Sequence, residues 1–346
     1  MITGERLELR ELTVNGVGGL DRAVISVNGP VAVEQMGVVD AHSHVWIEQV
    51  SGANLEGLIL DDADAITAEL IDYRTAGGGG IVDCQPGGCG RNGRMLRQIS
   101  QLSGVHIIAC TGFHLRRYYA PDGALWQKTD GEAYAVFMDE VQKGLVETRQ
   151  EEQPVYPGFF KIAAEATLSV SPEPLFRAAA AACRISGLAI EMHTEKGSGA
   201  EEFLEFFLGQ DVSPGRLVFC HMDKRPDFGL HRELASAGVL LEYDTFVRPK
   251  YKPQQNVWPL LQKMVEEGFA GQIALATDMA LTNMWQRLGG GPGPVTFLNQ
   301  VKSDLERLRL DPEVVQQLMG GNISARLAVA APQVTRNFHE QYPVFV

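Results

Sequence analysis

Two histidines, His42 and His44, stand two positions apart in the short apolar run VVDAHSHVW, residues 38–46. Because successive side chains of a β-strand point to opposite faces, His42 and His44 would share a face and could bind one metal ion. The alternative is a strand whose two histidines are only hydrogen bonded. The elements that must position these rings decide between the two interpretations.

Short, strongly apolar segments alternate with segments of helical spacing from residue 38 onward. The predicted strands cover residues 38–46, 81–84, 105–112, 159–163, 188–193, 217–221, 239–244 and 273–278. The predicted helices cover residues 61–77, 94–102, 131–147, 173–186, 200–208, 230–237, 257–267 and, as closing helices, 303–330. Eight buried strands alternating with helices are typical of a parallel barrel. We therefore predict an α/β fold, a (β/α)8 TIM barrel, with a doubly wound sheet as the alternative.

A small β extension is expected ahead of the barrel. Residues 5–33 alternate apolar and polar positions around Asn15-Gly16 and Asn28-Gly29-Pro30, which predicts one or two hairpins. We expect a β-hairpin extension packed on the barrel over residues 1–36, the barrel itself over residues 37–332, and a C-terminal tail over residues 333–346.

The composition is that of a globular protein, with 45% hydrophobic and 21% charged residues among 346. Lys and Arg total 30 against 43 Asp and Glu, and the net charge of −13 argues against nucleic acid or an anionic membrane as partner. The five cysteines form no Cys-x-x-Cys pair, which fits a reducing compartment. With no signal segment and no apolar run long enough to span a bilayer, a cytoplasmic protein is expected.

Polar residues end several of the predicted strands, and active sites of such barrels lie at these carboxyl ends. They are His42 and His44 on the first strand, Lys161 on the fourth, His193 on the fifth, His221 on the sixth and Asp278 on the eighth. Each alone could be a hydrogen-bonded histidine, a snorkelling lysine or a helix cap. Together they indicate a metal site, because four of the eight histidines meet at the mouth of one barrel. Structural roles are expected for His106, His114, His231 and His339 and for the core thiols Cys84 and Cys220.

With these residues in place, the sequence resembles the phosphotriesterase family of the amidohydrolase superfamily. The resemblance rests on the His-x-His strand and on the segments FKIA (160–163), EMHTE (191–195), CH (220–221), ATD (276–278) and GGNISAR (320–326). It implies that Lys161 is carboxylated and bridges two divalent metals. One metal would be bound by His42, His44, Lys161 and Asp278, and the other by Lys161, His193 and His221. Zinc is expected first, with Mn, Co or Fe as alternatives that suit the same donors.

The resemblance also implies a mechanism. A carbamate on Lys161 would give the metals two oxygen donors and a negative charge, which a free ammonium cannot. Two metals would acidify a bridging water to hydroxide and polarise the substrate oxygen, and Asp278 would take up the proton after attack. Lys161 and Asp278 are therefore the expected catalytic residues.

The loops look most like the lactonase branch of that family, whose members include enzymes that open phosphorylated sugar lactones. Arg248 and Lys250, with Tyr251 beside them, would hold a phosphate. The alternative is that these two side chains are solvated charges on a loop without a binding role. This branch carries an arginine and a tyrosine soon after the strand-eight Asp-Met, where this chain has ALTNMW, residues 280–285. Tyr119 and Trp285 could instead line an apolar pocket for an acyl or aryl lactone.

The sequence thus predicts a binuclear metal-dependent hydrolase that opens a lactone, phosphorylated or not, or cleaves a carboxylic ester. Phosphotriester hydrolysis is the alternative reaction, and a ligand-binding protein without turnover is the alternative class. The expected partner is a small lactone or ester, with no nucleic acid and no membrane. A homodimer is an oligomeric state that the sequence leaves open.

Overall fold

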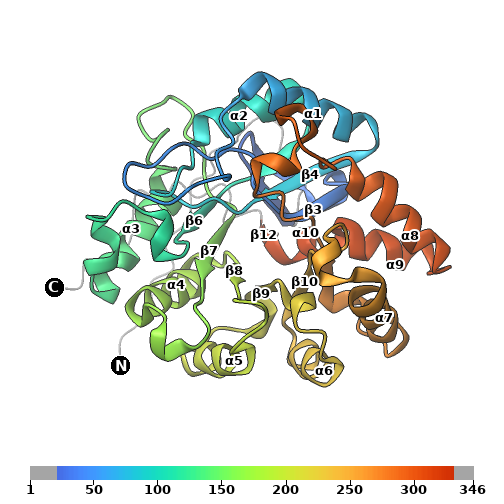
Figure 1. Cartoon of the computed structure of the whole chain (residues 1–346). Coiled ribbons are helices and arrows are strands. Elements are labelled where there is room, and N and C mark those ends of the chain that lie inside the picture. Colours follow the sequence, from blue (N-terminus) through green and yellow to red (C-terminus); the bar gives the residue numbers. More distant parts are fainter. Residues whose placement is uncertain (1–21, 331–346) are drawn as a thin grey trace, which may run out of the picture.

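Parallel strands form a barrel at the centre of the computed structural model, which describes residues 22–330 (Figure 1). The barrel strands are β3 (Val38–Ser43), β4 (Gly78–Asp83), β5 (His106–Ile108), β6 (Cys110–Gly112), β7 (Phe159–Ala163), β8 (Ile190–His193), β9 (Leu217–Cys220), β10 (Leu240–Tyr243) and β11 (Ile273–Leu275). Only Ala109 separates β5 from β6, and together they make the third barrel strand. The predicted eight-stranded α/β barrel is confirmed.

Two seams close the strands into a barrel. Strands β3 to β5 form one hydrogen-bonded sheet and β6 to β11 another, joined through Ala109. At the second seam the backbone N–H of Asp278 donates to the carbonyl of His42 at 2.8 Å, and that of Thr277 donates to Oδ1 of Asp40 at 3.0 Å. The last barrel strand therefore meets the first beside two of the predicted metal ligands.

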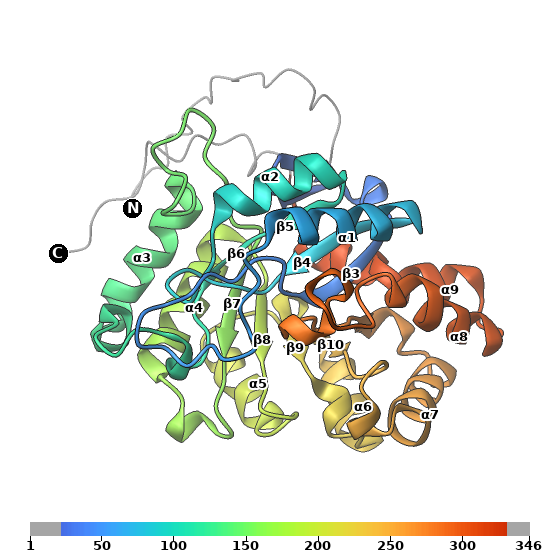
Figure 2. The ribbon, with the colours of Figure 1, turned by 45° about the horizontal axis from the view of Figure 1, so that its top comes forward.

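Helices surround the strands on the outside (Figure 2). They are α1 (Ala63–Thr75), α2 (Gly93–Ser103), α3 (Asp130–Lys143), α4 (Glu173–Ser186), α5 (Ala200–Gly209), α6 (Phe228–Ala237), α7 (Pro253–Glu266), α8 (Lys302–Arg307), α9 (Pro312–Gln316) and α10 (Asn322–Leu327). Their ends follow local chemistry: Thr129 and Glu132 form a capping box at α3, which stops at Gly144, earlier than predicted, where φ is 88°. Among residues 22–330, no helix has the length and apolar character that crossing a bilayer requires.

The closing segment is less regular than the predicted run of helix over residues 303–330. Between α9 and α10 the chain turns at Gly320, whose φ is 136°. A side chain there would place its Cβ 2.5 Å from the backbone nitrogen of Val39 and 2.8 Å from the carbonyl oxygen of Gly37. Close packing of this turn against β3 therefore requires glycine and interrupts the helix.

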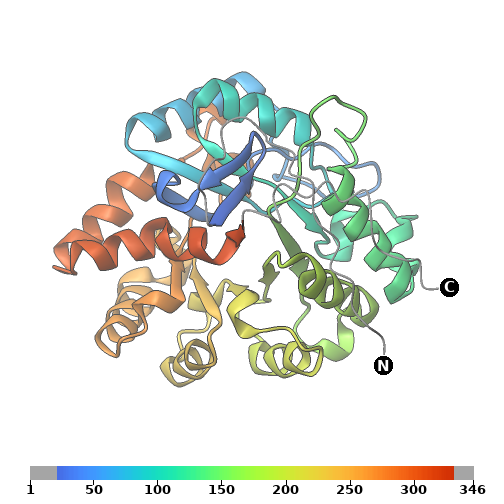
Figure 3. The same cartoon turned by 180° about the vertical axis from the view of Figure 1, so that it is seen from behind.

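A three-stranded antiparallel sheet lies across the amino-terminal end of the barrel (Figure 3). It consists of β1 (Arg22–Ser26), β2 (Gly29–Ala32) and β12 (Val329–Ala330), with Asn28 in the turn of the β1–β2 hairpin. The backbone N–H of Val27 donates to the carbonyl of Ile107 at 2.9 Å and attaches the hairpin to the barrel. The predicted Asn15-Gly16 turn and the tail over residues 333–346 lie outside the described residues.

The barrel interior changes from apolar to polar along its strands. At the amino-terminal end, Val24 of the hairpin belongs to the same buried apolar cluster as Phe159 and Ala189. Every second residue of a strand faces the same side. Lys161 therefore shares the interior face with Phe159, and Glu191 shares it with Ala189, each two residues nearer the carboxyl end of the barrel. The polar half of the interior leads to the carboxyl ends of the strands, where the predicted ligands stand.

Candidate metal centre

A cavity of about 140 Å³ lies at the carboxyl ends of the barrel strands. Its polar wall is formed by His42, His44, His193, His221, Lys224 and Asp278. Its apolar wall is formed by Ile47, Leu55, Leu58 and Ala280, and Gln85, His114 and Tyr118 complete the lining. Five of the six predicted metal ligands therefore line one cavity, and Lys161 does not.

A first group of donors comes from the two ends of the barrel sequence. Oδ1 of Asp278 lies 3.8 Å from Nε2 of His42 and 4.0 Å from Nε2 of His44. A cation bonded to each atom at about 2.0–2.2 Å fits between donors at such separations. Asp278 has φ of 49°, a left-handed conformation that is uncommon outside glycine and recurs at functional sites.

A second group of donors faces the same cavity from β8 and the end of β9. Nδ1 of His193 lies 2.9 Å from Nε2 of His221. His221 has φ of 64°, so the chain bends as it leaves β9 and the ring turns toward His193. These two nitrogens and the first group give the cavity two sets of donors.

The opposite nitrogens of three rings have oxygen partners. Nδ1 of His44 lies 2.7 Å from Oε1 of Gln85, and Nδ1 of His221 contacts Oδ2 of Asp244. Nδ1 of His42 lies 2.8 Å from Oε1 of Glu242, a close contact without the geometry of a hydrogen bond. At His44 and His221 the oxygen acceptor at Nδ1 fixes the proton there and leaves the Nε2 lone pair for a metal, the arrangement found around metal-binding histidines.

The charge states suit a cation. Burial lowers the pKa of all four histidines, to about 4 for His44 and well below 6.5 for His42 and His221, so the rings are neutral near pH 7. Burial alone would raise the pKa of Asp278, but the charges of Arg248 and Lys224 bring it below its usual value and keep the carboxylate ionised.

Asp278 uses its two oxygens differently. Oδ1 faces the histidines, whereas Oδ2 lies 3.0 Å from Nη2 of Arg248 and 3.8 Å from Nζ of Lys224. Nζ of Lys224 is also 3.2 Å from Oδ1 of Asp244. The carboxylate that the sequence assigned to proton transfer is therefore held by two cations.

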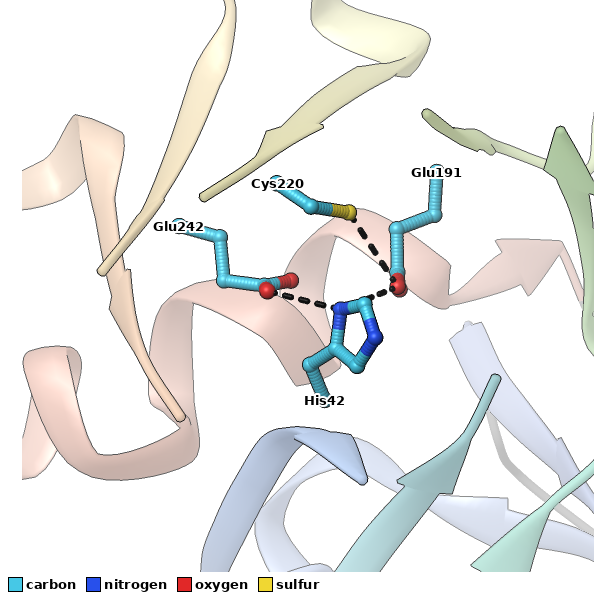
Figure 4. A group of neighbouring side chains, drawn as sticks. All are labelled: His42, Glu191, Cys220 and Glu242. Atoms are coloured by element: carbon cyan, nitrogen blue, oxygen red, sulfur yellow. Dashed lines mark hydrogen bonds and ion pairs between the residues drawn. The ribbon is translucent and has the colours of Figure 1, made fainter. Parts of the chain in front are cut away.

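Lys161 lies beneath the cavity in a wholly buried cluster, part of which is drawn in Figure 4. Its Nζ is 3.0 Å from Oε1 of Glu191, 3.3 Å from Sγ of Cys220 and 3.5 Å from Nδ1 of His42. Figure 4 shows the side chains of Glu191, Cys220 and Glu242 converging on His42. Oε2 of Glu191 and both carboxyl oxygens of Glu242 have no hydrogen-bond partner within the described structure.

The residues present fit two divalent cations, because neutral imidazole nitrogens and an ionised carboxylate converge on the cavity. The ion pair of Lys161 with Glu191 bears on the predicted carbamate. Carboxylation would replace the ammonium by a negative group, so this ion pair and the modification exclude each other. Carboxylation of Lys161 stays a prediction.

The structure does not bring the predicted substrate-binding residues to the cavity lining. Trp285 is fully buried and its indole N–H donates to the carbonyl of Met279 at 3.0 Å. The hydroxyl of Tyr119 accepts the backbone N–H of His114 at 2.9 Å. Tyr118 lines the cavity instead, because η2 (Arg116–Tyr118) turns about 120° per residue and sends adjacent side chains in different directions.

The predicted phosphate-binding loop is also placed differently. Arg248 pairs with Asp278, and its guanidinium also donates to the Asp278 carbonyl. Lys250 is exposed, with Nζ 4.9 Å from the centre of the Tyr251 ring. Neither Lys250 nor Tyr251 lines the cavity.

Sequence reasoning missed several residues of the centre besides Gln85, Tyr118 and Asp244. His114 was given a structural role, yet it lines the cavity with its ring 5.2 Å from that of His193. Lys224, three residues after His221, supplies the positive charge expected from another loop. Glu191 and Glu242 each stand two residues before a strand-end polar residue, and this spacing placed them on the interior face.

Comparisons with known proteins identify the family. The sequence model of the Phosphotriesterase family matches residues 22–323. The phospho-furanose lactonase of Mycoplasmopsis synoviae is 25% identical over 286 residues, covering 79% of this chain and 80% of that protein. The N-acetyltaurine hydrolase of Xenopus tropicalis is 25% identical over 319 residues, covering 79% of this chain and 89% of that protein.

The fold has solved counterparts. The crystal structure of a lactonase from Listeria monocytogenes superimposes with a TM-score of 0.80 at 23% identity, covering 88% of this chain and 98% of that one. The family match extends from β1 into α10, and so includes every strand of the barrel and all residues of the centre. The chain therefore belongs to the phosphotriesterase family.

Proposed function

We propose that this phosphotriesterase-family hydrolase uses two divalent metal ions to open a small lactone or to cleave a carboxylic ester. The observation that carries the proposal is the convergence of five predicted ligands, in neutral or anionic form as metals require, on one cavity of about 140 Å³. His42, His44 and Asp278 would hold one ion, and His193 and His221 the other. Lys161, after carboxylation, would bridge them.

When bound, the metals would lower the pKa of a water molecule between them and polarise the substrate carbonyl. The residues of the chain would provide proton transfer and orientation of the ligands. Asp278 accepts the proton released by the attacking water, and Arg248 and Lys224 hold its carboxylate in place at Oδ2. Gln85 and Asp244 keep two of the rings oriented.

The lining suits a small substrate with two unlike sides. Ile47, Leu55 and Leu58 offer an apolar surface to a ring or acyl carbon chain. Lys224 offers an ammonium to hydroxyl or anionic substituents on the other side of the substrate, a function that the sequence assigned to Arg248 and Lys250. This division supports a sugar-derived or otherwise oxygen-rich lactone.

The lactonases among the relatives support ring opening as the first reaction to test. The N-acetyltaurine hydrolase among the relatives suggests a second reaction to test, the hydrolysis of an amide whose substrate carries an anionic group. The positive charge of Lys224 would also suit such a substrate. Phosphotriester hydrolysis is the further alternative, since the same activated water could attack phosphorus.

The test is a substrate panel with the zinc- or manganese-loaded protein. Neutral lactones, phosphorylated sugar lactones, aryl esters, N-acyl amino sulfonates and aryl phosphotriesters are compared by kcat/KM in a pH-indicator assay. We expect lactones to be the best class. Fast phosphotriester or amide hydrolysis without lactone turnover would replace the proposed reaction by that one.

A second measurement separates an enzyme from a binding protein. Metal analysis of the purified, metal-loaded chain should find about two ions per chain. Fewer than one ion per chain, together with no turnover on the whole panel, would favour a ligand-binding protein that has kept the fold.

A further inference from the structure

A second pocket, of about 350 Å³, lies at the opposite end of the barrel from the metal centre. Three arginines line it: Arg22 begins β1, Arg216 ends η5 (Pro214–Arg216) just before β9, and Arg326 lies in α10. Figure 3 shows this end of the molecule, with β1 and α10 lying across the barrel. Three segments distant in sequence therefore bring their guanidinium groups to one place.

No acidic residue of the described chain lines this pocket, and none of its arginines forms an ion pair with a described residue. Elsewhere in the same structure a buried arginine is neutralised: Arg91 pairs with Glu140 and Glu147. In a chain with a net charge of −13, three neighbouring arginines without an acidic partner among residues 22–330 are a local exception.

Backbone carbonyls fix two of the guanidinium groups. Arg326 donates to the carbonyls of Pro214, Leu217 and Gly238 at 2.8, 3.1 and 3.0 Å. Arg22 donates to those of Ala325 and Ala328 at 2.7 and 3.1 Å. These bonds preorganise the groups, so that little side-chain freedom is left to lose when a ligand binds.

Many donors are left over. An arginine has five N–H donors; Arg22 uses only those of Nη2, and Arg216 makes one long contact, 3.5 Å, to the carbonyl of Ala328. The hydroxyl of Ser213 also lines the pocket, whereas the amide nitrogen of Asn322 already donates to the carbonyls of Ala270 and Ile273, at 2.7 Å each. The free donors of the site therefore come mainly from Arg22 and Arg216.

The like charges act on one another. Burial and the charge of Arg216 lower the pKa of Arg326 to about 10. A bound anion would relieve this repulsion and receive charge-assisted hydrogen bonds from more than one guanidinium, which bind tetrahedral oxyanions through pairs of N–H groups.

We propose that the arginine pocket of Arg22, Arg216 and Arg326 binds a phosphate-class oxyanion, either free phosphate or the phosphate group of a small metabolite. The ligand would tie together β1, the segment before β9 and α10. This site is separate from the metal centre and does not depend on the proposed reaction.

Thermal unfolding of the metal-loaded, full-length protein tests the site, with inorganic phosphate titrated at constant ionic strength. We expect a saturable rise in Tm for the wild type. In Arg216→Ala the apparent affinity should fall by about tenfold or more, as expected for a lost charge-assisted pair. Arg232→Ala is the matched control, because Arg232 is exposed, does not line the pocket, and has its guanidinium carbon 5.8 Å from the centre of the Phe228 ring.

Phosphate could also bind at the metal centre, and the variant separates the two sites. An equal Tm rise in the wild type and Arg216→Ala, or no saturable rise in the wild type, would overturn the proposal. If Arg216→Ala does not fold, Arg216→Gln takes its place. Acetate should give no comparable rise, and an equal rise would also overturn a phosphate-class site. Glycerol phosphate distinguishes the sources: binding as tight as phosphate indicates a metabolite, and binding of phosphate alone indicates the free ion.

Discussion

The two ends of the barrel interior are made by the same strands from opposite kinds of side chain. Near the β1–β2 hairpin the interior is filled by apolar residues such as Phe159 and Ala189. Two positions further along β7 and β8 stand Lys161 and Glu191, an ion pair sealed from solvent. Apolar burial stabilises the fold, whereas buried charge costs stability and is kept where chemistry needs it.

The largest effect is expected from Lys161→Ala, at the boundary between the two halves. Loss of this side chain should remove both metals and reduce turnover to background, because the proposed bridging ligand is gone. Metal analysis and kcat/KM on the best substrate measure the two together. Cys220→Ser, which changes a neighbouring side chain of the same cluster, should keep both. Turnover retained in Lys161→Ala would contradict the assignment of the centre.

Asp278→Asn should come next, with kcat reduced by about 10²–10⁴-fold for the loss of a proton acceptor. Asparagine tolerates the left-handed backbone of this position and keeps its N–H for the carbonyl of His42. The variant should therefore keep the fold, but its unfolding temperature should fall, because Arg248 and Lys224 lose a largely buried anionic partner. A kcat within a few-fold of wild type would mean that another group takes the proton.

Phe159→Ala probes the apolar half and should cost about 3–5 kcal/mol of the free energy of unfolding, because it leaves a cavity in a fully buried cluster. Denaturant unfolding measures the loss. Metal affinity of the folded protein should be nearly unchanged, since Phe159 contributes no donor. A collapse of metal affinity would show that the two halves are not independent.

The smallest effect is expected at Glu242, which contacts the far side of the His42 ring. Glu242→Leu should lower metal affinity by about 10–100-fold, the usual effect of removing a partner of a metal-binding histidine. Glu242→Gln keeps an oxygen acceptor and should lose less. Competition with a chelator gives both affinities. Equal affinities for the two variants and the wild type would show that Glu242 has only a packing role.

The fold and the grouping of five candidate ligands around one cavity were predictable because both depend on regular periods. Alternation of apolar strands with helices indicated the barrel, and the period of two along a strand placed His42 with His44. The same period would have found Glu191, two residues before His193. Polar residues at the strand ends drew attention first, whereas Glu191 and Glu242 lie inside their strands.

The loops were not predictable in the same way. A loop has no period that says which of two adjacent residues faces a cavity; Tyr119 was predicted, and it is Tyr118 that lines the cavity. Positive charge for a substrate phosphate was expected from Arg248 and Lys250, but the cation that lines the cavity is Lys224, because the turn after His221 brings its side chain there. Trp285 was expected to line the pocket, but its side chain is fully buried in the hydrophobic core.

The seam between the first and last barrel strands has a thermodynamic consequence. The hydrogen bond from Asp278 to the carbonyl of His42 closes the barrel, and the side chains of the same two residues face each other as metal donors. A cation held there would cross-link positions 236 residues apart in the chain. Opening of the seam and release of the ion would then be one event, so metal occupancy should slow hydrogen exchange at the Asp278 amide more than at amides of the hairpin.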